Sequence, residues 1–206
     1  MNVYKLMAGA SGFCIFLGMA SAAGAAGVVG NGSPASCTEA AFNAALNGGG
    51  NVTFNCGGAP KTIVLTSYKQ IGANTVIDGA GLITLSGGNT TSHFQVFSGK
   101  SLTLKSITLK DGKGVFTSAG AVENFGALAL ENAHVDGNTG KPNGQGGAIY
   151  NSGSMTALNS SISSNTLTGA QGGGIFNQGS LTLNNSIVAG NVITNPSAAV
   201  NVAGAG

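Results

Sequence analysis

The sequence contains no arginine and no tryptophan, and only 7% of its 206 residues are charged. Its eight basic residues are all lysines, they are scattered along the chain, and the formal net charge is +2. Arginine supplies the planar fork that grips phosphates and guanine edges, so its absence, together with the lack of a basic cluster, indicates no nucleic-acid partner. Intrinsic disorder does not fit either, because 42% of the residues are hydrophobic.

Long hydrophobic runs are also missing, apart from a short one near the start. Lys5 precedes the apolar stretch 13–17, and Ala20-Ser21-Ala22 has the small-residue pattern of a cleavage site. The stretch is short and glycines flank it, which does not fit a membrane anchor. We therefore expect residues 1–23 to be a signal peptide. The mature protein would then be secreted, extracellular or on the bacterial cell surface (the outer membrane).

Cysteine is scarce, with three residues in the chain. Cys14 would leave with the signal peptide, so Cys37 and Cys56 remain. An even pair in an exported chain predicts a disulfide, which would close a loop of roughly twenty residues and stabilise the fold by about 3 kcal/mol. A metal site or a nucleophilic thiol is the competing interpretation, and it lacks a nearby histidine.

Glycine and asparagine are abundant, and they recur at a regular spacing. Residues 120–138, 147–165 and 173–191 align at a register of about 26 residues, and a fainter copy spans residues 94–112. Within each copy apolar and polar residues alternate as in β-strands, and turns rich in glycine or asparagine separate the strands. The pattern predicts an all-β fold, a single-stranded right-handed parallel β-helix (a solenoid) of about six turns over residues 34–206.

Identical positions of successive turns would stack directly on one another. Two interior columns are expected: Val122, Ile149 and Ile175, and Leu128, Met155 and Leu181. Stacked asparagine amides hydrogen-bond from turn to turn, which predicts structural ladders rather than ligand-binding residues. The ladders are Asn124, Asn151 and Asn177; Asn132, Asn159 and Asn185; and Asn138, Asn165 and Asn191. Gly126, Gly153 and Gly179 are expected to supply positive φ at the corners.

The two ends of a solenoid expose strand edges and an unroofed core, so they need covers. Residues 36–47 are expected to form an N-terminal capping helix, with Ser36 and Glu39 as its capping box. The disulfide would fix this helix to the first turn. The C-terminal stretch, which contains Pro196, has no comparable cover. Self-association or a further domain is therefore expected at the last turn.

The repeats resemble the polymorphic outer-membrane-protein (Pmp-type) repeats of bacterial surface proteins. The Gly-Gly-Ala-Ile motif of that family stands at residues 146–149 and, altered, at residues 172–175. Its Phe-x-x-Asn motif is matched at 135–138, 162–165 and 188–191, where an aliphatic residue replaces the phenylalanine.

More loosely, "VIDGAGLITLSG" and the later "FQVFSGKSLTLKSITLKDG" look like exported proteins of the pectate-lyase-like superfamily. The resemblance covers roughly residues 50–195 and implies the β-helix fold. It leaves the activity open, because such repeats occur in adhesins, passengers and polysaccharide enzymes alike.

Residues for polysaccharide chemistry do not come together in the pattern. A glycosidase needs two carboxylates across a cleft, and the register does not place two of the six acidic residues on one strand face. The lyase resemblance implies an arginine base, which the chain lacks, and Lys105 and Lys110 are more simply solvated charges. His93 and His134 have no carboxylate partner in register. We predict no catalytic residue, no metal and no cofactor.

One surface feature is a candidate for binding. If the valine and isoleucine column points inward, strand alternation turns Tyr150 and Phe176 outward, and a uniform register places Phe97 on the same stripe. Such a stripe offers a platform for sugar rings or a partner protein; alternatively, the loop 136–145 folds over it.

We therefore expect a non-catalytic secreted or cell-surface module, adhesin-like or passenger-like, whose partner is a polysaccharide or a host glycan. The alternative is a carbohydrate-active protein of the pectate-lyase-like type, a lyase or a hydrolase.

Overall fold

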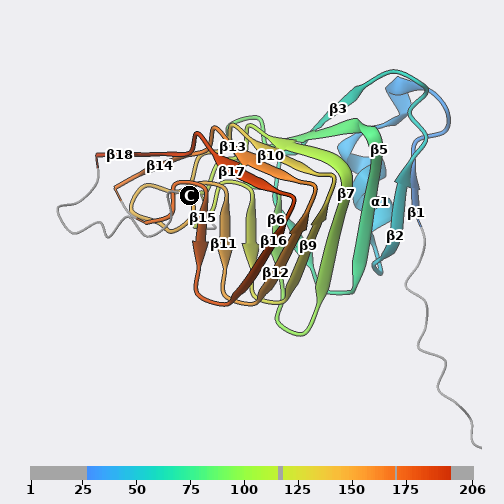
Figure 1. The fold of residues 1–206 in the computed structure, drawn as a ribbon. Coiled ribbons are helices and arrows are strands. Elements are labelled where there is room, and N and C mark those ends of the chain that lie inside the picture. The colour runs from blue at the N-terminus through green and yellow to red at the C-terminus, as the bar shows by residue number, and fades with distance from the viewer. Residues whose placement is uncertain (1–26, 116–117, 170, 196–206) are drawn as a thin grey trace, which may run out of the picture.

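Short parallel strands wind into a solenoid of about six turns, and one short helix lies near its N-terminal end (Figure 1). This computed structural model describes residues 27–115, 118–169 and 171–195. The all-β solenoid fold is thus confirmed, while its right-handedness stays a prediction. The expected signal peptide, residues 1–23, lies outside the described residues.

The described residues form three sheets along the solenoid, and all strand pairs in them are parallel. The first sheet bends between its shorter strands and has eleven members: β1 (Gly27–Val29), β2 (Gly50–Phe54), β3 (Lys61–Val64), β5 (Thr75–Ser86), β7 (Ser101–Lys110), β9 (Ala127–Glu131), β10 (His134–Asp136), β12 (Ser154–Leu158), β13 (Ser161–Ser163), β16 (Ser180–Asn184) and β17 (Ile187–Ala189). The second has the order β4 (Lys69–Ile71), β6 (Phe94–Val96), β8 (Val122–Asn124), β11 (Ile149–Asn151) and β15 (Ile175–Asn177).

The third sheet belongs to loops that leave the corner between the other two. It pairs β14 (Thr166–Thr168) with β18 (Val192–Thr194). Single bridges extend the same stack, because Thr139 pairs with both Lys113 and Thr166, and Gln145 pairs with Gln171. The loops are therefore stacked on one another, like the strands.

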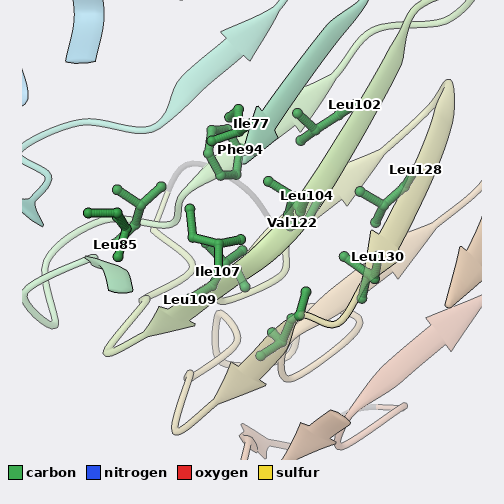
Figure 2. Close-up of a cluster of buried hydrophobic side chains, with 14 of the residues drawn as sticks. Ile77, Leu85, Phe94, Leu102, Leu104, Ile107, Leu109, Val122, Leu128 and Leu130 are labelled. Atoms are coloured by element: carbon green, nitrogen blue, oxygen red, sulfur yellow. The ribbon is translucent and has the colours of Figure 1, made fainter. Parts of the chain in front are cut away.

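The interior columns follow the predicted register. Ile149 pairs with Val122 on one side and Ile175 on the other, and Met155 lies between Leu128 and Leu181. Figure 2 shows the packing of this interior around Leu104 and Leu130, where side chains from β5, β6, β7, β8 and β9 meet. Both leucines are fully buried, so truncating either to alanine should cost about 2–5 kcal/mol of stability.

The corner glycines have a different role from the one expected. Gly126, Gly153 and Gly179 do not have positive φ. Instead, a Cβ on Gly153 would lie 2.0 Å from the backbone oxygen of Gly126, and one on Gly179 would lie 1.9 Å from that of Gly153. The expectation of positive φ was wrong, because these positions need glycine for the close approach of successive turns.

Positive φ is found at the bend of the first sheet. Asn132, Asn159 and Asn185 have φ values of 51°, 49° and 47°, and each directly follows a strand of the first sheet. Asparagine tolerates this left-handed conformation better than other residues with a Cβ. Of this column, Asn185 Nδ2 donates to Asn159 Oδ1.

The other two asparagine columns form hydrogen-bonded chains, whose members are fully buried except in the last turn, where Asn177 and Asn191 are not. Asn124 Nδ2 donates to Asn151 Oδ1, and Asn151 Nδ2 donates to Asn177 Oδ1, each over 2.6 Å. In the other column the corresponding bonds run from Asn138 to Asn165 and from Asn165 to Asn191. Backbone carbonyls accept the second amide hydrogen, so side chains that lie inside the core keep their hydrogen bonds.

Helix α1 (Glu39–Leu46) covers the N-terminal end of the core. Phe42 is fully buried, and its ring lies 6.0 Å from that of Phe54 and 6.4 Å from that of Phe94. The predicted capping box was wrong, because Ser36 lies in a preceding 3-10 turn and the side chain of Thr38 accepts the hydrogen bond from the Ala41 backbone.

The predicted disulfide is confirmed and joins this cap to the first turn. Cys37 directly precedes the N-cap of α1, and Cys56 lies just after β2. Both cysteines are buried, and their Cα atoms are 5.7 Å apart.

The last described turn leaves part of the core uncovered. Leu183 continues the column of Leu130 and Ala157, which are buried, but it is 43% exposed. Among residues 27–115, 118–169 and 171–195, no strand pairs with the outer edge of β15, β16 or β17. Pro196 lies outside the described residues.

Candidate binding face

The second sheet turns a row of side chains toward the outside of the solenoid. On β4, β6 and β11 the two flanking residues are buried and the middle residue is more exposed, as strand alternation requires. Pairing between neighbouring strands aligns these middle residues in one outer column: Gln70, Gln95, Glu123, Tyr150 and Phe176.

Aromatic rings gather at the C-terminal half of this column. The rings of Tyr150 and Phe176 are stacked, with centroids 5.8 Å apart and an angle of 17° between their planes. Phe125 lies beside them, its ring centroid 5.8 Å from that of Tyr150. Sequence reasoning missed Phe125, because it follows β8 at a corner where strand alternation no longer predicts direction. The available signal was that Phe125 directly precedes Gly126, the glycine that recurs at this corner in each repeat.

Phe97 does not lie in this column, so the prediction that placed it there from a constant repeat length was wrong. Gln95 takes the place one turn before Glu123, and Phe97 follows the end of β6. The Phe125 backbone N–H donates to Val96, so the two phenylalanines occupy equivalent corner positions in neighbouring turns. They are exposed to similar extents, 39% and 38%. We call Phe97, Phe125, Tyr150 and Phe176 the aromatic patch.

Hydrogen bonds orient polar groups beside the aromatic patch. Glu123 is only 9% exposed and accepts hydrogen bonds from Gln95 Nε2, over 2.8 Å, and from the Ser118 backbone. Tyr150 donates its hydroxyl hydrogen to Gln178 Oε1, also over 2.8 Å. These bonds fix the orientation of a carboxylate and a phenol beside the stacked rings.

The loop 136–145 makes its backbone hydrogen bonds with the loops of neighbouring turns. The backbone N–H of Lys141 donates to Ser118, and that of Asn143 donates to Thr168. Tyr150 and Phe176 themselves are neither fully buried nor fully exposed. Their rings are thus accessible at least in part to a ligand.

The remaining acidic residues are distributed over other parts of the surface. Asp78 Oδ2 lies 3.9 Å from Lys105 Nζ, and Asp111 Oδ2 lies 3.5 Å from Lys110 Nζ. Asp136 accepts a hydrogen bond from the Ser163 hydroxyl. No described group of three or more histidine, cysteine, aspartate or glutamate residues is arranged to hold a metal ion. Glu123 therefore has amide and backbone partners rather than a second carboxylate.

The two histidines lie in opposite environments. His93 is fully buried and lies with Nε2 3.0 Å from the backbone oxygen of Leu85, and burial lowers its pKa to about 4. His134 is exposed and contacts the Ser161 hydroxyl. Neither histidine belongs to the outer column.

A partly buried ion pair lies at the N-terminal end of the same sheet. Lys69 is 8% exposed and bonds to Glu39 on the helix, which also accepts two hydrogen bonds from Thr66. Partial burial acts to raise the pKa of Glu39, but the hydrogen bonds from Lys69 and Thr66 outweigh it and bring the pKa below its usual value. The pair links the capping helix to β4.

No family model, curated protein or solved structure matches this chain. In the described part of the chain, none of the helices has the length and apolar character needed to span a bilayer.

Proposed function

We propose that the protein is a non-catalytic binding module that acts outside the cell, secreted or at the bacterial surface, and holds a polysaccharide or a host glycan on the aromatic patch. The observation that carries this proposal is the stack of Tyr150 and Phe176, continued by Phe125, on the outer face of a five-stranded parallel sheet. The resemblance of the repeats to Pmp-type repeats supports an adhesin-like or passenger-like role.

The chemistry of the patch suits sugars. The apolar faces of sugar rings pack against aromatic rings, while sugar hydroxyls need donors and acceptors at the edges. Gln95, Glu123 and Gln178 supply such groups beside the rings. Because the strands hold the rings in place, little conformational entropy is lost on binding.

A carbohydrate-active enzyme is the second candidate, and Glu123 is the observation that favours it. This carboxylate is largely buried next to the patch, as a general acid or base would be. Its hydrogen-bond partners are Gln95 and Ser118, however, and the two-carboxylate arrangement of glycosidases requires a second acid across a cleft. The binding role is therefore the better supported of the two.

A glycan array tests the proposal, with the double variant Tyr150→Ala/Phe176→Ala beside the wild-type protein. Val64→Ala/Leu158→Ala is the matched control, because it removes two exposed apolar side chains from the first sheet. We expect selective glycan binding that the patch variant loses and the control keeps. Equal binding by all three proteins, or none by any, refutes the proposal. Release of shortened glycan by the wild-type protein but not by Glu123→Gln would establish the enzyme instead.

A further inference from the structure

A groove of about 950 Å³ opens where the C-terminal half of α1 faces the chain segment around β4. Asn43, Leu46 and Asn47 line it from the helix side, and residues 67–73 line it from the sheet side. The groove belongs to neither the core nor the aromatic patch, and the predicted role of α1 as a cap does not require it.

Three amide side chains belong to the polar lining of the groove. The side chains of Asn43, Asn47 and Gln70 are exposed and make no hydrogen bond to any other part of the chain that the structure describes. Each amide both donates and accepts, which is the pairing that a hydroxyl group requires. Leu46 and Ile71 add an apolar part to the lining, as in sites for small neutral ligands.

The groove carries no free charge among the described residues that line it. Of the described residues that line the groove, Lys69 alone is charged, and its ammonium group donates to Glu39 and to the hydroxyl of Ser67. An anionic or cationic ligand would lose hydration in the groove without gaining a countercharge. The lining therefore favours a neutral ligand rich in hydroxyl groups.

Gln70 connects the groove to the aromatic patch. It is the first member of the outer column that runs through Gln95 and Glu123 to Tyr150 and Phe176. At the usual strand spacing of about 4.8 Å, the column is roughly 19 Å long, which is the length of several sugar units in an extended chain. Groove and patch thus lie along one line, parallel to the solenoid axis.

We propose that the groove is a second subsite for the same glycan, and that it binds a neutral saccharide unit of a chain whose other units lie on the aromatic patch. This inference rests on the proposed function. A glycan lying along the column in the direction of Gln70 reaches the groove and meets α1, so that the capping helix becomes part of the binding site.

Isothermal titration calorimetry with oligosaccharides of defined length tests the subsite. The probes are cellohexaose, mannohexaose and maltohexaose, their disaccharides, and hexagalacturonate as the charged counterpart. Asn47→Ala/Gln70→Ala removes two groove amides, and Tyr150→Ala/Phe176→Ala removes the stacked rings. Asn51→Ala is the control, because this exposed amide lies on β2 in the first sheet.

We expect a neutral hexaose to bind better than hexagalacturonate. The groove variant should bind the neutral hexaose with about tenfold lower affinity, since each lost hydrogen bond lowers the affinity by a factor on the order of ten or less. The disaccharide, too short to reach both sites, should bind the groove variant as it binds the wild type, and Asn51→Ala should change neither.

The groove and patch proposals fail separately. If the patch variant loses hexaose binding while the groove variant keeps full affinity, the second subsite is refuted and the proposed function stands. If the groove variant alone loses binding, the patch is refuted as a binding site, and the groove binds the glycan by itself and not as a second subsite. If no oligosaccharide binds the wild-type protein, both proposals are refuted.

Discussion

Gly153 offers the sharpest test of how the turns of this solenoid are held together. Its φ is not positive, and a Cβ at this position would lie 2.0 Å from the backbone oxygen of Gly126. Contacts this short do not occur between real atoms, so Gly153→Ala must push the two turns apart at this corner. Overpacking of this kind costs about 1–3 kcal/mol, and the obstacle here is backbone, which yields less than a side chain does.

The substitution Gly153→Asn separates close approach from backbone conformation. If the position required positive φ, asparagine would be tolerated far better than alanine, because asparagine adopts the left-handed region readily. The structure predicts that asparagine destabilises at least as much as alanine. Gly58→Ala is the matched control: it has no atom within 4 Å of its added Cβ and no positive φ, and should change stability by less than about 0.5 kcal/mol.

Urea unfolding followed by circular dichroism measures these differences as free energies. For a chain of this size, 1 kcal/mol corresponds to roughly 2–4 °C in Tm, so thermal melts should show the same order of variants. The reasoning is refuted if Gly153→Ala is as stable as Gly58→Ala, or if Gly153→Asn is clearly more stable than Gly153→Ala.

Three further predictions concern stability. Asn159→Ala should lose about 1 kcal/mol in the same unfolding assay, whereas Asn159→Gly should lose less, because φ at this position is 49°; equal losses would contradict this. Burial lowers the pKa of His93 from 6.5 to about 4, so between these pH values the unfolded chain binds a proton that the folded chain does not bind. The free energy of unfolding should therefore fall as the pH falls from 6.5 toward 4, by about 3 kcal/mol in total. In His93→Gln the urea midpoint should depend less on pH across that range. A pH profile identical to that of the wild type would contradict the role given to His93. Reducing the Cys37–Cys56 bridge should cost about 3 kcal/mol, measured with and without reductant, and Cys37→Ser/Cys56→Ser should then be insensitive to reductant.

The repeats made the fold predictable from sequence, because each turn buries the same kinds of side chain. The alignment of three copies directly predicts the pairings of Ile149 with its neighbours above and below, and the two hydrogen-bonded asparagine chains that start at Asn124 and Asn138. The role of Gly153 did not follow, because a recurring glycine is equally consistent with positive φ and with close approach. Only the position of the neighbouring backbone decides between them.

The site was harder to predict because the repeat length is not constant. Val96 pairs with Asn124 and Ser101 with Ala127, so the corner that holds Phe97 is two residues longer than the next one. A uniform register therefore placed Phe97 opposite Glu123, where Gln95 lies. Likewise, no local pattern shows that Glu39 binds Thr66 and Lys69, residues far along the chain, instead of capping its own helix.

The stacked loops have a consequence for how such a chain changes over generations. Thr139 pairs with Thr166 and Gln145 with Gln171, yet the loop between the first members of these pairs is one residue longer than the loop between the second. The strands on both sides stay in register nevertheless. Insertions and deletions at this rim therefore leave the columns of the core intact. The loops along one edge can therefore change in length and shape during evolution while the residues of the core stay the same.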